Sequence, residues 1–195
     1  MYKRQAYTYY KRQLQILAHH TPTRHFLLKC PEHLWFVDAL LKVFPDACVV
    51  WTHRDPVASV ASYCSLSSLQ RRMLYGHIDR PAIGAHIRDR FRIGVERAMS
   101  ARREIADESR FFDVDFQQLV TDPIAMVHRI KGHFGIPHAD GADATMQAWL
   151  DNGRKDKRGQ HRYSAEQWGL DQGAIHAEYA DYIERFSIPV KASEA

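Results

Sequence analysis

Apolar residues recur at helical spacing in several stretches of the chain. In residues 4–18, Tyr7, Tyr10, Leu14 and Leu17 lie three or four positions apart, which predicts an amphipathic helix. The same kind of spacing, with Pro at the first position of several segments, predicts further helices over 31–44, 56–73, 85–107, 123–134, 142–150 and 172–186.

Short apolar runs between these helices predict three strands, over residues 25–29, 48–52 and 111–116. The run at 48–52 is continuous rather than alternating, which is typical of a parallel strand covered on both faces. Strands that alternate with helices predict an α/β fold with a mostly parallel sheet flanked by helices. We expect a single domain over residues 1–190 and a short tail at 191–195.

The size and charge of the chain narrow the function classes. Its 195 residues suffice for one domain with a real core. The net charge of +4 suits an anionic ligand, but the basic residues are not clustered as nucleic-acid binding would require. Three cysteines without a CxxC pair argue against a disulfide scaffold and a zinc cluster. We see no signal peptide and no transmembrane segment, so a cytoplasmic location is expected.

Basic residues end two of the predicted strands, at Lys29 and Arg54, and a helix start follows each. In parallel sheets, ligands bind beyond the carboxyl ends of the strands, and helix N-termini favour anions. The planar guanidinium of Arg54 suits a phosphate, and Ser62 lies about two turns into the next helix. An alternative stays open, in which the arginine pairs with a carboxylate and the serine serves packing.

A basic stretch follows the helix predicted at 142–150 and could close over the same anion. A solvated surface loop is the alternative reading. Its candidate ligand-binding residues are Arg154, Lys155, Lys157, Arg158 and Gly159.

The sequence lacks the motifs of several other kinds of catalytic or binding site. His53-Arg54-Asp55 matches the start of the kinase catalytic loop, but Val60 stands where that loop needs asparagine. The chain has no HExxH, GxSxG or Walker A sequence. The histidines are scattered, and no metal site is predicted.

Several segments together resemble the bacterial sulfotransferases that use 3′-phosphoadenosine 5′-phosphosulfate, a group related to the tyrosylprotein sulfotransferases. The resemblance covers nearly the whole chain and rests on the order and spacing of its motifs. They are Leu27-Leu28-Lys29-Cys30-Pro31-Glu32-His33-Leu34, Phe44-Pro45-Asp46-Ala47, His53-Arg54-Asp55-Pro56 with Ser62, the segment 113–123, and the segments Gly159-Gln160-His161-Arg162-Tyr163-Ser164 and Trp168-Gly169-Leu170.

The resemblance implies a sulfotransferase fold of the P-loop-NTPase type and sulfonate transfer to a hydroxyl or amine, without a metal. The product of the donor would be adenosine 3′,5′-bisphosphate. By this resemblance, Arg54 and Ser62 hold the 3′-phosphate, Lys29 neutralises charge near the transferred group, and the basic loop covers the nucleotide. Glu32 and His33 are the visible candidates for the general base that deprotonates the acceptor.

The chain departs from the family in one respect: nothing before His25 matches the Gly/Ser/Thr-rich loop that holds the 5′-phosphosulfate. We therefore expect an N-terminally incomplete fold whose exposed sheet edge favours homo-oligomers. Two readings stay open, a piece of a longer enzyme or a chain without activity. The alternative functions are a non-catalytic sulfotransferase-fold remnant or interaction module and, less favoured, another nucleotide-dependent transferase. The acceptor is not identified.

Overall fold

The computed structural model describes residues 2–21, 24–153 and 163–190. The chain divides into two compact units, one of Met1–Cys48 with Arg92–Glu108 and the other of Val49–Phe91 with Ser109–Ala195. The single domain expected over residues 1–190 stays a prediction. The expected tail at 191–195 lies outside the described residues.

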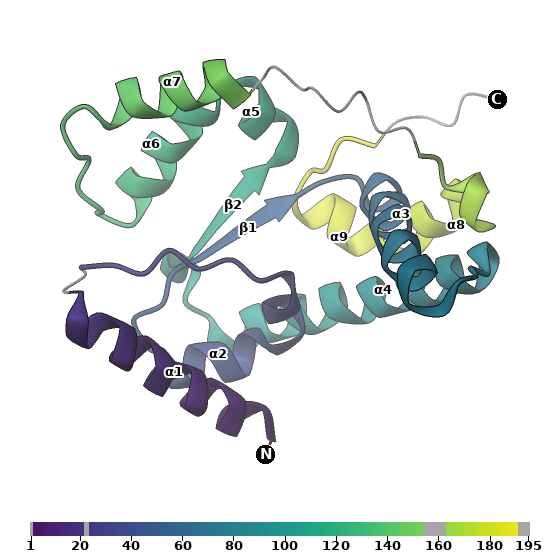
Figure 1. Cartoon of the computed structure of the whole chain (residues 1–195), viewed down its shortest axis with the longest axis horizontal. Helices are drawn as coiled ribbons and strands as arrows, with labels where there is room; N and C mark the ends of the chain where they lie inside the picture. Colours follow the sequence, from purple (N-terminus) through teal and green to yellow (C-terminus); the bar gives the residue numbers. More distant parts are fainter. Residues whose placement is uncertain (1, 22–23, 154–162, 191–195) are drawn as a thin grey trace. The chain divides into compact units, whose positions relative to one another are not determined.

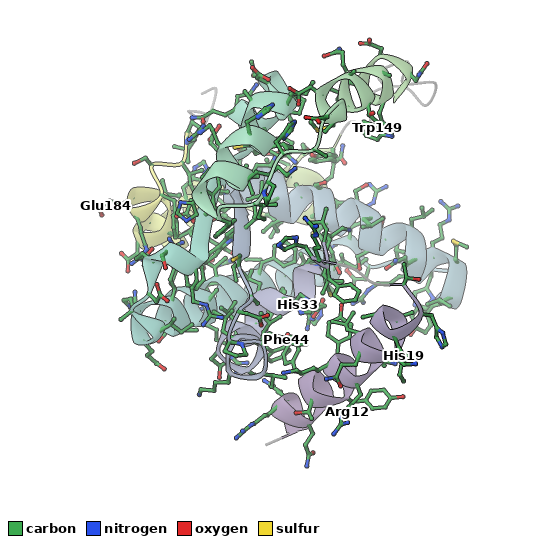
Figure 2. All side chains as sticks on the ribbon, turned by 90° about the vertical axis from the view of Figure 1, so that its left-hand side faces the viewer. Arg12, His19, His33, Phe44, Trp149 and Glu184 are labelled. Atoms are coloured by element: carbon green, nitrogen blue, oxygen red, sulfur yellow. The ribbon has the colours of Figure 1, made fainter. Side chains whose placement is uncertain are left out.

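In the first unit, α1 (Tyr2–His20) packs against α2 (Val37–Val43). The helix predicted for residues 4–18 is confirmed, and of its apolar face Tyr7 and Leu14 are buried, whereas Leu17 is 62% exposed. Tyr10 adds an edge-on contact with the ring of Phe44, with 6.1 Å between the ring centroids. Figure 2 labels Phe44 and His33, two residues of this unit.

The segment before α2 differs from the prediction. Residues 25–29 form no strand, and Leu27 is 99% exposed. A strand needs a neighbour for its backbone N–H and C=O groups, and within the described residues no strand pairs with this segment. The helix predicted over 31–44 is also divided, into η1 (Pro31–Phe36) and α2, because Phe36 departs from helical geometry at φ −142° and ψ 30°.

The second unit contains a parallel pair of strands, β1 (Val49–His53) and β2 (Phe111–Asp115), shown in Figure 1. Val49 pairs with Phe111 and His53 pairs with Asp115, so both strands end together. The strands predicted at 48–52 and 111–116 are confirmed to within one residue. Because the strands are parallel, their carboxyl ends meet at one edge of the sheet.

Burial along β1 alternates, so the prediction that both its faces are covered is wrong. Trp51 and His53 are buried, whereas Val50 is 43% exposed. Successive side chains of a strand point to opposite faces, and here one face takes the packing. Phe186 stacks on His53 with 4.0 Å between the ring centroids, and its ring lies 5.3 Å from that of Trp51.

Helices complete the structure. They are α3 (Pro56–Tyr75), α4 (Arg80–Ile105), η2 (Glu108–Arg110), α5 (Phe116–Thr121), α6 (Pro123–His133), α7 (Ala142–Gly153), η3 (Glu166–Trp168), α8 (Gln172–Glu178) and α9 (Ala180–Arg185). Helix α4 begins earlier than predicted because Asp79 accepts a hydrogen bond from the backbone N–H of Ala82. The helix predicted over 172–186 is broken at Tyr179 into α8 and α9.

Three short helices, η2, α5 and η3, were not predicted. The side chain of Asp115 accepts a hydrogen bond from the backbone N–H of Gln118 and so caps α5 directly at the end of β2. Across the described residues, none of the helices combines the length and apolar character needed to cross a membrane.

Candidate functional site

The candidate site begins at the carboxyl end of β1, where His53-Arg54-Asp55 leads into α3. Asp55 caps this helix by accepting a hydrogen bond of 2.9 Å from the backbone N–H of Val57, and Pro56 occupies its first turn. The positive end of the α3 dipole therefore lies beside Arg54. Helix ends of this kind favour a bound anion.

Two neighbours orient the Arg54 guanidinium. Its Nη2 donates a hydrogen bond of 3.1 Å to the hydroxyl of Tyr163. Its central carbon lies 4.6 Å from the centroid of the Phe116 ring, a cation–π contact. A guanidinium carries five N–H donors in a rigid fork, and the Tyr163 contact engages one of its two terminal nitrogens. The arrangement suits bidentate binding of an anion.

The hydroxyl of Tyr163 contacts both Arg54 and Ser62. Burial alone would raise the pKa of the Tyr163 hydroxyl, but hydrogen bonds to Ser62 and Arg54, together with the charge of Arg54, lower it overall. The Tyr163 hydroxyl thus has two polar partners, Arg54 and Ser62. These three residues form a compact polar cluster at the end of β1.

A second contact beside this cluster joins Asp55 to His176, in the C-terminal part of the chain. Nε2 of His176, on α8, lies 3.0 Å from Oδ1 of Asp55, the same oxygen that caps α3. Helix α8 is in turn fastened to α4, because Nε of Arg88 donates a hydrogen bond of 2.7 Å to Glu178. The Asp55 carboxylate is therefore already hydrogen-bonded, which weakens its repulsion of an anion that binds beside Arg54.

His53 does not take part in this cluster. His53 is 3% exposed, and its two ring nitrogens lie 2.9 Å from the hydroxyl of Tyr182 and 2.7 Å from Oδ1 of Asp113. Such complete pairing of a buried imidazole is typical of a structural role.

The predicted catalytic residues Lys29, Glu32 and His33 all belong to the first unit. Lys29 lies in an exposed segment before η1, and Glu32 lies in the first turn of η1. Nδ1 of His33 lies 2.9 Å from the hydroxyl of Tyr7 on α1. Burial lowers the pKa of His33, and burial, followed by the charge of nearby Cys30, raises the pKa of Tyr7 to about 12.

The structure thus brings together Arg54 and Ser62 among the predicted residues, and separately the neighbours Lys29, Glu32 and His33. The predicted residues of the basic loop, Arg154, Lys155, Lys157, Arg158 and Gly159, lie outside the described residues. A cavity of about 800 Å³ in the first unit is lined by residues of α1 and α2. None of the predicted site residues lines it.

Sequence reasoning missed Tyr163, Phe116 and His176. Tyr163 stands inside a segment that resembles the family, but its residue type suggested no role. Phe116 and His176 gave no signal, because their contacts with Arg54 and Asp55 arise only when the chain folds.

Comparison with known proteins gives the family. A family model described as "Sulfotransferase family" matches residues 2–140. Among curated proteins, omega-hydroxy-beta-dihydromenaquinone-9 sulfotransferase Stf3 of Mycobacterium bovis is 21% identical over 166 residues, 82% of this chain and 40% of that protein. Stf3 of Mycobacterium tuberculosis matches equally. The chain thus spans about 40% of the length of these curated relatives.

Solved structures agree. Sulfotransferase STF9 from Mycobacterium avium is 31% identical, with a TM-score of 0.85 over 95% of this chain and 47% of that one. Sulfotransferase STF1 from Mycobacterium tuberculosis is 34% identical, with a TM-score of 0.64 over 79% of this chain and 39% of that one. The predicted α/β fold with a parallel sheet flanked by helices is confirmed. The chain belongs to the sulfotransferase family and has the fold of its bacterial members.

Proposed function

We propose that this chain transfers a sulfonate group from 3′-phosphoadenosine 5′-phosphosulfate to a hydroxyl or amine acceptor, and that Arg54 and Ser62 hold the 3′-phosphate of the donor. The observation that carries the proposal is the meeting of Arg54, Ser62 and Tyr163 beside the start of α3. Family membership supports the reaction class.

The physical chemistry of the cluster favours a phosphate over other ligands. Arg54 supplies charge and a fork of N–H donors, and the N-terminus of α3 adds the positive end of its dipole. The hydroxyl groups of Ser62 and Tyr163 supply further donors. Asp55 would repel an anion, but the backbone of Val57 and the ring of His176 already engage its carboxylate.

In the proposed reaction, the acceptor oxygen or nitrogen bonds to sulfur as the bond from sulfur to the bridging phosphate oxygen breaks. The acceptor proton passes to a general base, and negative charge develops on the bridging oxygen. We assign the neutralisation of that charge to Lys29 and the role of base to Glu32 or His33. Arg154, Lys155, Lys157, Arg158 and Gly159 would cover the nucleotide.

For His33 to act as a base, its Nε2 must be able to accept a proton. That requires the tautomer in which Nδ1–H donates to the oxygen of Tyr7, 2.9 Å away. The lowered pKa of His33 keeps the ring neutral near pH 7, which suits this role. Tyr7 would then be a positioning residue.

Binding of the 3′-phosphate is tested by thermal denaturation with two nucleotides, adenosine 3′,5′-bisphosphate and adenosine 5′-monophosphate. At about 100 times its Kd, the bisphosphate should stabilise the chain by about 2.7 kcal/mol. For a chain of this size, that corresponds to a rise in Tm of about 5–11 °C. The monophosphate lacks the 3′-phosphate and should give a much smaller rise. Equal rises would refute the assignment.

Single-residue variants test which side chains bind the 3′-phosphate. Loss of a charge-assisted contact in Arg54→Ala should weaken bisphosphate binding by about 10–100-fold, measured by titration calorimetry. Ser62→Ala should weaken it less. Arg72→Ala, at the other end of α3 and exposed, is the matched control and should bind like the unaltered chain. If all three variants bind equally, the 3′-phosphate does not lie at Arg54.

Turnover is tested separately with radiolabelled donor and a panel of acceptors. The name of Stf3 describes a hydroxyl-bearing menaquinone, so hydroxyl compounds are the first class to test. Transfer that is lost in Lys29→Ala would support the enzyme. Bisphosphate binding without transfer to any acceptor would instead favour the non-catalytic alternative.

A further inference from the structure

Three potential metal ligands converge in the second unit, away from Arg54. His128 lies on α6, His138 in the connection after it, and Asp143 in the first turn of α7. One ligand atom from each lies within 4.8 Å of the other two. Figure 1 shows α6 and α7 alongside one another, consistent with their direct contacts.

The geometry aims both imidazoles at one carboxylate. Nε2 of His128 lies 2.9 Å from each oxygen of Asp143, and Nε2 of His138 lies 2.9 Å from Oδ1. The two rings are stacked, with 4.2 Å between their centroids and 27° between their planes. Stacking of this kind holds both Nε2 atoms on the same side.

These separations are close to those around a bound ion. In tetrahedral zinc sites, metal–ligand bonds of about 2.0–2.2 Å place neighbouring ligand atoms about 3.3 Å apart. In these hydrogen bonds Nε2–H donates to the carboxylate. When an ion binds, each neutral imidazole must carry its proton on Nδ1, so that Nε2 can ligate, and the Nε2 and carboxylate oxygen atoms must move apart by a few tenths of an ångström. All three side chains are exposed, so such movement meets little packing resistance and an ion has direct access.

The donor set selects the class of ion. Two imidazole nitrogens with one carboxylate suit Zn²⁺, Co²⁺ or Ni²⁺, whereas Mg²⁺ and Ca²⁺ prefer oxygen ligands.

Helix α7 is only partly packed against its neighbours. It buries none of its side chains, and Trp149 on this helix is 72% exposed. Ala142, Met146 and Leu150, which follow one another at intervals of four along α7, are only half-buried. The contacts of Asp143 with His128 and His138 add a polar link between α7 and the residues before it.

We propose that His128, His138 and Asp143 bind one divalent transition-metal ion, best fitted by Zn²⁺, with water completing its coordination. The ion fastens α7 to α6 and has a structural rather than a catalytic role. The proposal does not depend on the sulfonate-transfer function.

The test uses the full chain after treatment with EDTA and dialysis. Titration calorimetry with ZnCl₂ should show one tight site per chain, and CoCl₂ should give visible absorption typical of a bound Co²⁺ ion. His138→Ala and Asp143→Asn should each weaken Zn²⁺ binding by about tenfold or more, since each removes one of three protein ligands. Added Mg²⁺ should not compete.

His86→Ala is the matched control, because His86 is an exposed histidine on α4 outside the cluster. It should bind Zn²⁺ like the unaltered chain. Far-ultraviolet circular dichroism checks that every variant folds, and hydrogen exchange of α7 should slow with Zn²⁺ in the unaltered chain but not in His138→Ala. Absence of a stoichiometric site, or equal affinity in all four proteins, would overturn the proposal.

Discussion

His53 and Tyr182 show how a histidine in a suggestive sequence can be part of the core. Nε2–H of His53 donates to Asp113, so Nδ1 accepts from the hydroxyl of Tyr182. Burial raises the pKa of Tyr182, which keeps this hydroxyl protonated as a donor. The His-Arg-Asp order that begins like a kinase loop therefore contains one structural residue, His53, and one candidate ligand residue, Arg54.

Tyr182→Phe should destabilise the chain, because it leaves the buried Nδ1 of His53 without its donor. We expect a loss of about 1–3 kcal/mol in the free energy of unfolding, measured by urea denaturation. Tyr75→Phe, at a site that is 69% exposed, should change the stability little and serves as the control. Equal effects of the two changes would contradict the structural role of His53.

His33 should titrate below the ordinary histidine pKa of about 6.5, because burial disfavours its charged form. The unfolded chain then binds this proton more readily than the folded one. The contribution of His33 to stability is therefore complete above about pH 6.5 and is lost as the pH falls toward its folded pKa. Histidine ring NMR, assigned with His33→Gln, measures the pKa directly. A value above 6.5 would contradict the burial of His33 against α1.

Helix α4 approaches η3 closely at Gly84. A Cβ added at Gly84 would lie 2.1 Å from the backbone oxygen of Trp168, so the two backbones nearly touch. At Gly132 on α6, an added Cβ meets nothing within 4 Å. These two glycines therefore predict opposite outcomes for the same substitution.

Gly84→Ala should cost about 1–3 kcal/mol of unfolding free energy, because the backbone of Trp168 must move. Gly132→Ala should instead stabilise the chain by about 0.4–1 kcal/mol, because alanine restricts the unfolded chain. Urea denaturation of both variants measures the difference. If Gly84→Ala proved neutral, the contact between α4 and η3 would be wrong.

The four tryptophans of the chain report on its two units. Trp35 belongs to the first unit, and Trp51, Trp149 and Trp168 belong to the second. If residues 1–190 form one cooperative domain, all four should lose their native environment at the same urea concentration. Fluorine NMR of the chain labelled with 5-fluorotryptophan follows each residue. A separate transition for Trp35 would show that the units unfold independently.

Much of the local structure could be read from residue patterns. The spacing of apolar residues predicted α1, and the Asp-Pro pairs at 55–56 and 122–123 predicted α3 and α6. Arg54 was predicted at a strand end and Ser62 in the following helix, and the structure has them there. These features depend on neighbours within about two helical turns, so the local sequence encodes them.

Other features arise only when distant segments meet. Residues 25–29 have the composition of a strand but no partner among the described residues, and β1 is covered on one face instead of two. Tyr163 reaches Arg54 from 109 positions away, and His176 reaches Asp55 from 121. The histidines of the proposed metal site looked scattered because two helices and a turn bring them together. Strand pairing, burial and side-chain convergence depend on the path of the whole chain, which no local pattern contains.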